Sequence, residues 1–190
     1  MEAERELLKR QPERRRSMLW GAAALVIGLS LAAWAPWNSV GAGQDHLSSN
    51  DIAARAAAFA AAGPVLVDKV PVNERQQAVV ALNLPAPQAS ALIADIDAGR
   101  TDLVYITVWD DVAEDGDVVE LSSDGLTVSV PLLNQPTRVA FPMPRQGVVN
   151  ITGVGDGGGG ITVGAKSGSA RVALPYMQVG QRQGIPVRIQ

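Results

Sequence analysis

The chain has 190 residues, enough for one ordinary domain and an appendage, and its net charge of −3 gives no electrostatic reason to expect a nucleic-acid partner. It contains no cysteine, which excludes disulfides, thiolate metal sites and thiol nucleophiles. Aromatic residues make up only 4% of a sequence that is 47% hydrophobic, so we expect a core of small and β-branched side chains.

The N-terminal region combines a basic tail, residues 1–17, with an uncharged apolar stretch, residues 18–37. The apolar stretch is near the lower length limit of a membrane-spanning helix, and Trp20 and Trp34 lie where interfacial tryptophans are favoured. Because basic residues resist translocation, the sequence predicts a single-pass anchor in a bacterial inner membrane. The N-terminus would be cytoplasmic and the rest of the chain periplasmic, or otherwise extracytoplasmic.

A cleaved export signal is the alternative interpretation of this region. An arginine pair at 15–16 resembles a twin-arginine signal, and small residues at 33–35 resemble a signal-peptidase site. Pro36 would block cleavage there, whereas the small residues at 40–42 offer a later site. A buried helix of a soluble domain is a third interpretation. The anchor and the cleaved signal both place the main domain outside the cytoplasm.

Residues 38–63 are expected to form a spacer whose second half, DIAARAAAFAAAG, is a helix. Ser49 or Asn50 can cap its start, and a Gly-Pro pair ends it. Its apolar face is mostly alanine, with Ile52 and Phe59 as the larger side chains. Burial of this helix is therefore weakly driven, and it is expected to be a stalk, a surface helix or a helix that packs on a partner.

Residues 64–190 are expected to form a mainly β domain with one helix near 87–98. The stretches VLVDKV and AVVALNL, before that helix, have the composition of strands. From residue 102 onward, short strands alternate with turn signals. The expected strands are 103–109, 117–122, 126–131, 137–142, 148–154, 161–166, 170–175 and 185–189. This spacing predicts an antiparallel β-sandwich, of the jelly-roll or immunoglobulin-like type.

Two motifs and one histidine are candidates for chemistry. The only histidine, His46, lies in the polar stretch GQDHLSSN, which is typical of a linker and favours neither a catalytic triad nor a zinc, copper or haem site. The glycines of DGGGG, 156–160, lead into a strand rather than a helix, so they do not form a phosphate-binding loop. We expect a hairpin turn there, or backbone closely approached by a neighbour or a ligand.

The second motif is the acidic stretch WDDVAEDGD, residues 109–117. It holds five carboxylates, those of Asp110, Asp111, Glu114, Asp115 and Asp117, and no Lys or Arg lies between positions 100 and 138. Crowded carboxylates repel one another, and calcium relieves this by taking several oxygen ligands. The spacing does not match an EF-hand. A solvated turn, a calcium site of these five residues and a docking face for a basic partner are the three interpretations.

The residues around this stretch resemble a known module. Trp109-Asp110, then Asp115-Gly116-Asp117, then an alternating strand and an Asp-Gly turn, resemble a small β-sandwich module of bacterial cell-envelope proteins, over residues 102–165. The resemblance implies a sandwich with an ordered acidic turn. It implies no catalytic residue.

The sequence as a whole favours a function without catalysis. We expect a membrane-anchored envelope accessory subunit that binds a protein partner through its extracytoplasmic β domain, with no required cofactor. The alternative is a calcium- or carbohydrate-binding β-sandwich module. A third hypothesis is a hydrolase that uses only Asp and Glu, although such enzymes need aromatic platforms that this chain scarcely offers.

Overall fold

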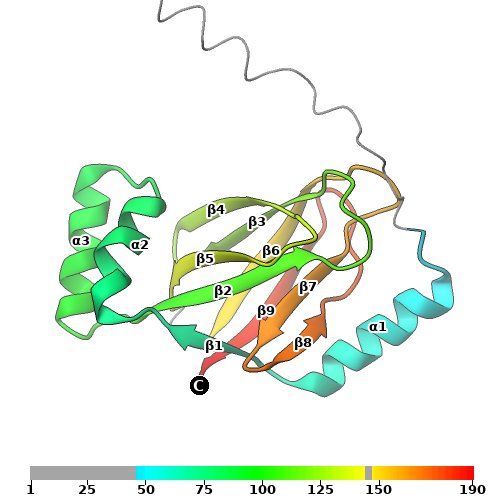
Figure 1. Cartoon of the computed structure of the whole chain (residues 1–190), viewed down its shortest axis with the longest axis horizontal. Helices are drawn as coiled ribbons and strands as arrows, with labels where there is room; N and C mark the ends of the chain where they lie inside the picture. Colours follow the sequence, from blue (N-terminus) through cyan, green and yellow to red (C-terminus); the bar gives the residue numbers. More distant parts are fainter. Residues whose placement is uncertain (1–45, 144–146) are drawn as a thin grey trace, which may run out of the picture. The chain divides into compact units, whose positions relative to one another are not determined.

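The computed structural model describes residues 46–143 and 147–190 (Figure 1). The expected basic tail, 1–17, and the expected anchor, 18–37, lie outside the described residues. Among the residues that are described, no helix has both the length and the apolar character needed to cross a membrane.

The described residues are mainly β, as the sequence predicts. Their helices are α1 (Ser49–Ala62), the 3₁₀ helix η2 (Val72–Glu74), α2 (Arg75–Ala81) and α3 (Ala86–Asp97). Their strands are β1 (Val65–Lys69), β2 (Leu103–Asp110), β3 (Val118–Ser123), β4 (Leu126–Pro131), β5 (Thr137–Pro142), β6 (Val148–Gly155), β7 (Val163–Ser167), β8 (Ala170–Ala173) and β9 (Arg182–Ile189).

All of these strands belong to one sheet. Within the described residues its order is β4-β3-β6-β9-β1-β2-β7-β8, and β5 pairs with the free side of β2. Neighbours are antiparallel except β1 and β9, which pair in parallel from Val65 opposite Val187. That pair is a departure from the antiparallel expectation, and it joins the half formed by β4, β3, β6 and β9 to the half formed by β2, β5, β7 and β8 (Figure 1).

The main core lies between the two halves of this sheet. Alternate residues of β2, Val104, Ile106 and Val108, contribute to the same buried cluster as Val119 of β3 and Ile151 of β6. Apart from Trp109 and Phe141, the buried hydrophobic side chains are aliphatic or methionine, in keeping with the low aromatic content. Because both halves share one core, loops at the ends of β2, β3, β6 and β7 are brought together.

The expectation of a strand at AVVALNL is wrong, because this stretch forms α2 and the turn after it. Ala78 and Val79 are buried in a second, smaller cluster with Ile96 of α3 and Leu103 of β2. Val80, one residue on, is 71% exposed. Packing of one helical face against α3 therefore overrides the β propensity of the two valines. The helix expected near 87–98 is confirmed as α3.

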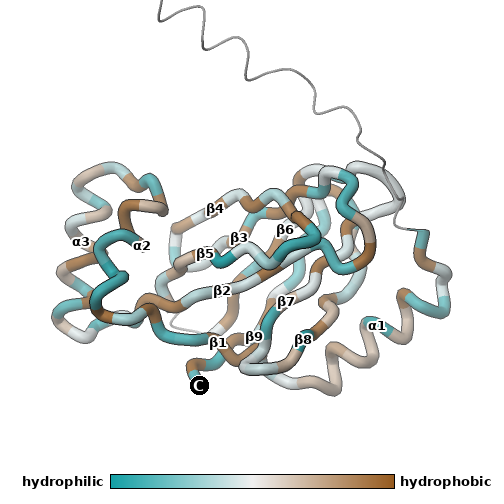
Figure 2. The backbone as a smooth tube through the Cα atoms, in the orientation of Figure 1, coloured by the Kyte–Doolittle hydropathy of each residue, from teal (hydrophilic) through white to brown (hydrophobic). Residues whose placement is uncertain are grey.

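Helix α1 lies beside β8 and is the first described element (Figure 1). It is mostly tan with a few teal positions when coloured by hydropathy, which reflects its alanines (Figure 2). The cap is Ser48 rather than Ser49 or Asn50. Its side chain accepts from the Asp51 N–H at 3.2 Å, and the Asp51 side chain accepts in return from the Ser48 backbone. This reciprocal capping box places the N-cap one residue before Ser49, the earlier of the two expected caps.

Candidate metal centre

Three carboxylates of the acidic stretch converge at one end of the sheet. Asp110 ends β2, and Asp115 and Asp117 lie in the loop that leads to β3. One carboxylate oxygen from each of the three lies within 4.8 Å of the other two. Oxygens that bind the same calcium ion at about 2.4 Å can be at most about 4.8 Å apart, so this spacing fits one ion.

Asp110 organises the first turn of the loop. Its side chain is 3% exposed, and Oδ1 accepts hydrogen bonds from the backbone N–H groups of Val112 at 3.2 Å and Ala113 at 3.1 Å. The hydroxyl of Thr162, from the segment before β7, donates to the same oxygen at 3.1 Å. These bonds fold the backbone around the carboxylate, as short acidic side chains do in turns. The position of Asp110 is thus fixed by its own loop and by Thr162.

Asp117 is fully buried, with 0% exposure. Its Oδ1 accepts from the Gly157 N–H at 3.0 Å, and its Oδ2 accepts from the Thr162 N–H at 3.3 Å. Burial raises the pKa of this carboxyl to about 8; the Gly157 N–H opposes that rise, whereas the charges of Asp115 and Asp110 add to it. Asp117 is therefore a carboxyl that holds a proton at neutral pH unless another positive charge replaces it.

Asp115 has the least satisfied carboxylate of the three. Both of its oxygens expose less than 1 Å², and neither accepts a hydrogen bond from a donor of the described residues. Burial raises the pKa of Asp115; a proton on Asp117 would offer it a hydrogen bond that lowers the pKa, and the charge of Asp156 raises it again. The backbone N–H groups of Asp115 and Asp117 also lower this pKa, although neither has the geometry of a hydrogen bond to the carboxylate. A buried carboxylate that lacks donors costs free energy, and either a shared proton or a cation removes that cost.

The DGGGG motif forms the other wall of this cluster. It joins β6 to β7, and these strands are not neighbours in the sheet, so the expectation of a hairpin turn is wrong. The alternative expectation, close approach of the bare backbone, is confirmed. A Cβ at Gly157 would lie 2.0 Å from the Asp115 carbonyl oxygen, and a Cβ at Gly160 would lie 2.0 Å from the Tyr176 hydroxyl oxygen. Only glycine lets the loop close over the carboxylates.

The remaining two acidic residues of the stretch lie outside the cluster. The Asp111 carboxylate pairs with Arg55 of α1, with 2.8 Å between Oδ2 and Nη1, and its Oδ1 accepts from the Trp109 indole N–H at 3.2 Å. Glu114 accepts a hydrogen bond from the Asn134 N–H at 2.8 Å. Of the five carboxylates considered as calcium ligands, the structure therefore brings Asp110, Asp115 and Asp117 together and gives Asp111 and Glu114 other partners.

The arrangement offers a set of oxygen ligands that a divalent cation could use. Three carboxylates provide a charge of up to −3, and within the described residues neither Asp115 nor Asp117 forms an ion pair with Lys or Arg. Hard oxygen ligands of this kind are those that calcium prefers. A substrate could not reach the Asp117 carboxyl, which is fully buried. His46 is exposed before α1 and does not belong to this cluster.

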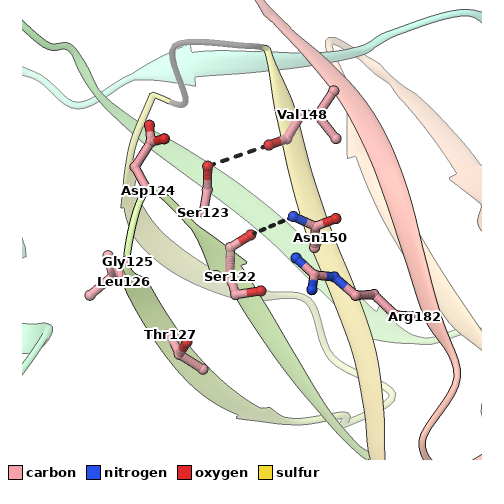
Figure 3. A pocket seen from close by; sticks show the side chains of 9 residues that line it. All are labelled: Ser122, Ser123, Asp124, Gly125, Leu126, Thr127, Val148, Asn150 and Arg182. Atoms are coloured by element: carbon pink, nitrogen blue, oxygen red, sulfur yellow. Dashed lines mark hydrogen bonds between the residues drawn. The ribbon is translucent and has the colours of Figure 1, made fainter.

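A separate hollow of about 310 Å³ lies beside the β3–β4 turn (Figure 3). Ser122, Asn150 and Arg182 line it from β3, β6 and β9, and Asp124 and Gly125 form its rim at the turn. No aromatic side chain lines it, so it lacks the stacking platform that sugar-binding sites use. The hollow gives the carbohydrate hypothesis less support than the carboxylate cluster gives the calcium hypothesis.

Sequence reasoning missed the residues that complete the cluster. Gly157 and Thr162 donate to Asp117 from about 40 positions away, and Arg55 reaches Asp111 from the spacer helix. The glycine run and the single arginine of an alanine-rich helix are visible signals in the sequence. Neither signal says that its partner is the acidic stretch, because that depends on which strands pair.

Comparison with protein-family models, with curated proteins and with solved structures finds no match to this chain.

Proposed function

We propose that this protein is a non-enzymatic, calcium-stabilised β module carried on the outer side of a membrane. The observation that carries the proposal is the convergence of Asp110, Asp115 and Asp117, with their oxygens within 4.8 Å. Asp115 adds the second support, because its buried oxygens accept no hydrogen bond from the described residues. An ion would satisfy that carboxylate and remove the repulsion within the cluster.

The proposed ion has a structural role. The cluster joins the β2–β3 loop to the β6–β7 loop, and each of these loops runs from one half of the sheet to the other. An ion bound there would fix the two loops together, and it would stabilise the folded state by linkage. The proposed ligand set is three carboxylates, with backbone carbonyls or water to complete the shell of six to eight oxygens that calcium takes.

The proposed location and partner rest on the sequence. The basic tail and apolar stretch at residues 1–37 favour an N-terminal anchor with the β domain outside the cytoplasm. Binding of a protein partner, as an accessory subunit of an envelope complex, is the role we propose for the module.

Thermal unfolding of the purified full chain tests the proposal. Calcium should raise the melting temperature and saturate, while equal ionic strength from sodium chloride should not. Asp115→Asn should remove the shift. Asp124→Asn, a matched control in the exposed β3–β4 turn, should keep it, since asparagine tolerates the positive φ of 48° at that position. A calcium shift of the same size in Asp115→Asn would reject the proposed site.

A further inference from the structure

Arg55 makes the polar contacts that attach helix α1 to the sheet. The Arg55 side chain is 10% exposed and uses three of its nitrogens. Its Nε donates to the Leu174 carbonyl at 2.6 Å, its Nη2 donates to the Val163 carbonyl at 3.1 Å, and its Nη1 forms the ion pair with Asp111. A guanidinium held in this way fixes both the position and the rotation of the helix that carries it.

The rest of α1 contributes little to this attachment. None of its 14 residues is buried, and only Ile52 and Phe59 join Arg55 on the half-buried face. Phe59 packs at the margin of the main core. An isolated helix of this length is only marginally stable in water, even when rich in alanine. The stability of α1 therefore depends on the Arg55 contacts.

Asp111 forms the ion pair with Arg55 and lies in the same turn as Asp110 of the carboxylate cluster. It lies between Asp110 and Val112, whose N–H is capped by Asp110 Oδ1. One Asp111 oxygen is held by the Trp109 indole and the other by Arg55. Any change that tightens or loosens this turn moves the acceptor for the helix.

We infer that ion occupancy of the carboxylate cluster and docking of α1 through Arg55 are thermodynamically coupled, so that each strengthens the other. The inference rests on the proposed function, since it concerns regulation of the same site. An ion that binds Asp110 would immobilise the turn and hold Asp111 in place for Arg55. Ion binding adds positive charge beside the turn, which by itself weakens the hold on the guanidinium; the coupling inferred here is that ordering of the turn exceeds this electrostatic effect.

The coupling has a consequence for how the domain is connected to the preceding chain. α1 is followed by Gly63 and leads directly into β1, so undocking α1 would leave the β sheet intact while freeing a segment of 14 residues. In the ion-bound state this segment is held against β8. Loss of the ion would raise the undocked fraction of α1 by the same factor as the coupling.

Two measurements on the full chain test this inference. One is hydrogen exchange over residues 48–62, read by mass spectrometry, and the other is the affinity for calcium, measured by calorimetry. In the wild type, calcium should slow α1 exchange several-fold relative to chelator. In Arg55→Gln, α1 should exchange rapidly in both conditions, and the dissociation constant for calcium should rise several-fold, because coupling is reciprocal. Arg188→Gln, an exposed arginine of β9, is the matched control and should behave as the wild type.

The outcomes separate the inference from the proposed function. Calcium binding to the wild type with unchanged α1 exchange, or with equal affinity in Arg55→Gln, would overturn the coupling and leave the ion site standing. Absence of calcium binding to the wild type would overturn both. If Arg55→Gln fails to fold, as judged by circular dichroism, Asp111→Asn provides the second test, because it removes the ion pair and keeps a side chain of the same shape. Equal calcium affinity in Asp111→Asn would then overturn the coupling.

Discussion

Asp117 should make the ion-free protein lose stability as the pH rises. Its folded-state pKa, about 8, lies above the ordinary value of 3.8. Between these two values the folded state binds one proton more than the unfolded state, so the free energy of unfolding falls with increasing pH. One proton corresponds to about 1.4 kcal/mol per pH unit, so raising the pH from 5 to 7 should cost on the order of 3 kcal/mol.

Thermal unfolding in chelator-treated buffer measures this effect. For a domain of this size a loss on the order of 3 kcal/mol corresponds to a fall in melting temperature of roughly 5–10 °C. Saturating calcium should abolish the fall, because the ion takes the place of the proton. Asp68, whose pKa is lowered first by its hydrogen bond with Lys166, acts in the opposite direction but only in more acid solution, outside this window.

The control for this prediction is Asp117→Asn, which cannot titrate and should show a shallower slope in chelator. An ion-free melting temperature that stays level or rises between pH 5 and pH 7 would refute the reasoning. It would mean that the Asp117 carboxyl is ionised in the folded state without a cation, and that the buried charge is compensated in another way.

Further substitutions test the packing around the site. Gly157→Ala would place a Cβ 2.0 Å from the Asp115 carbonyl and should cost about 1–3 kcal/mol in chemical unfolding, whereas Gly155→Ala, whose nearest contact would be an ordinary 3.4 Å, should cost clearly less. Phe141→Ala empties a fully buried core position and should cost about 3–5 kcal/mol, against less than about 0.5 kcal/mol for the exposed Val72→Ala; similar losses would contradict the assigned core. Ser48→Ala removes the α1 cap and should speed hydrogen exchange of α1 by about five-fold, from roughly 1 kcal/mol, with β-strand exchange unchanged; equal speeding of the strands would show that α1 does not open separately.

Much of the β structure could be predicted because its signals are local. The alternation in 103–109 marks β2, and Asp124-Gly125 marks the β3–β4 hairpin, where both residues have positive φ. Prolines at the start of α3 mark that helix. Each of these features depends on residues within a few positions of one another, so it can be read without knowledge of the fold.

The features that could not be predicted depend on distant partners. The parallel pairing of β1 with β9 joins residues about 120 positions apart, and nothing in either strand specifies it. The sequence does not reveal α2 as a helix, because its two valines favour a strand. Its helical form depends on the packing of Val79 against α3. The same limit applies to the carboxylate cluster. The acidic stretch and the glycine run were both visible, but their meeting depends on the two halves of the sheet sharing one core.

The central claim is that Asp110, Asp115 and Asp117 bind one divalent cation. Isothermal titration calorimetry of the full chain with calcium chloride, after removal of metal, tests it most directly. The account predicts one calcium ion per chain in the wild type and in Asp124→Asn, and none in Asp115→Asn. No binding to the wild type, or unchanged stoichiometry and affinity in Asp115→Asn, would contradict it and leave the cluster as protonated carboxyls that serve only the fold.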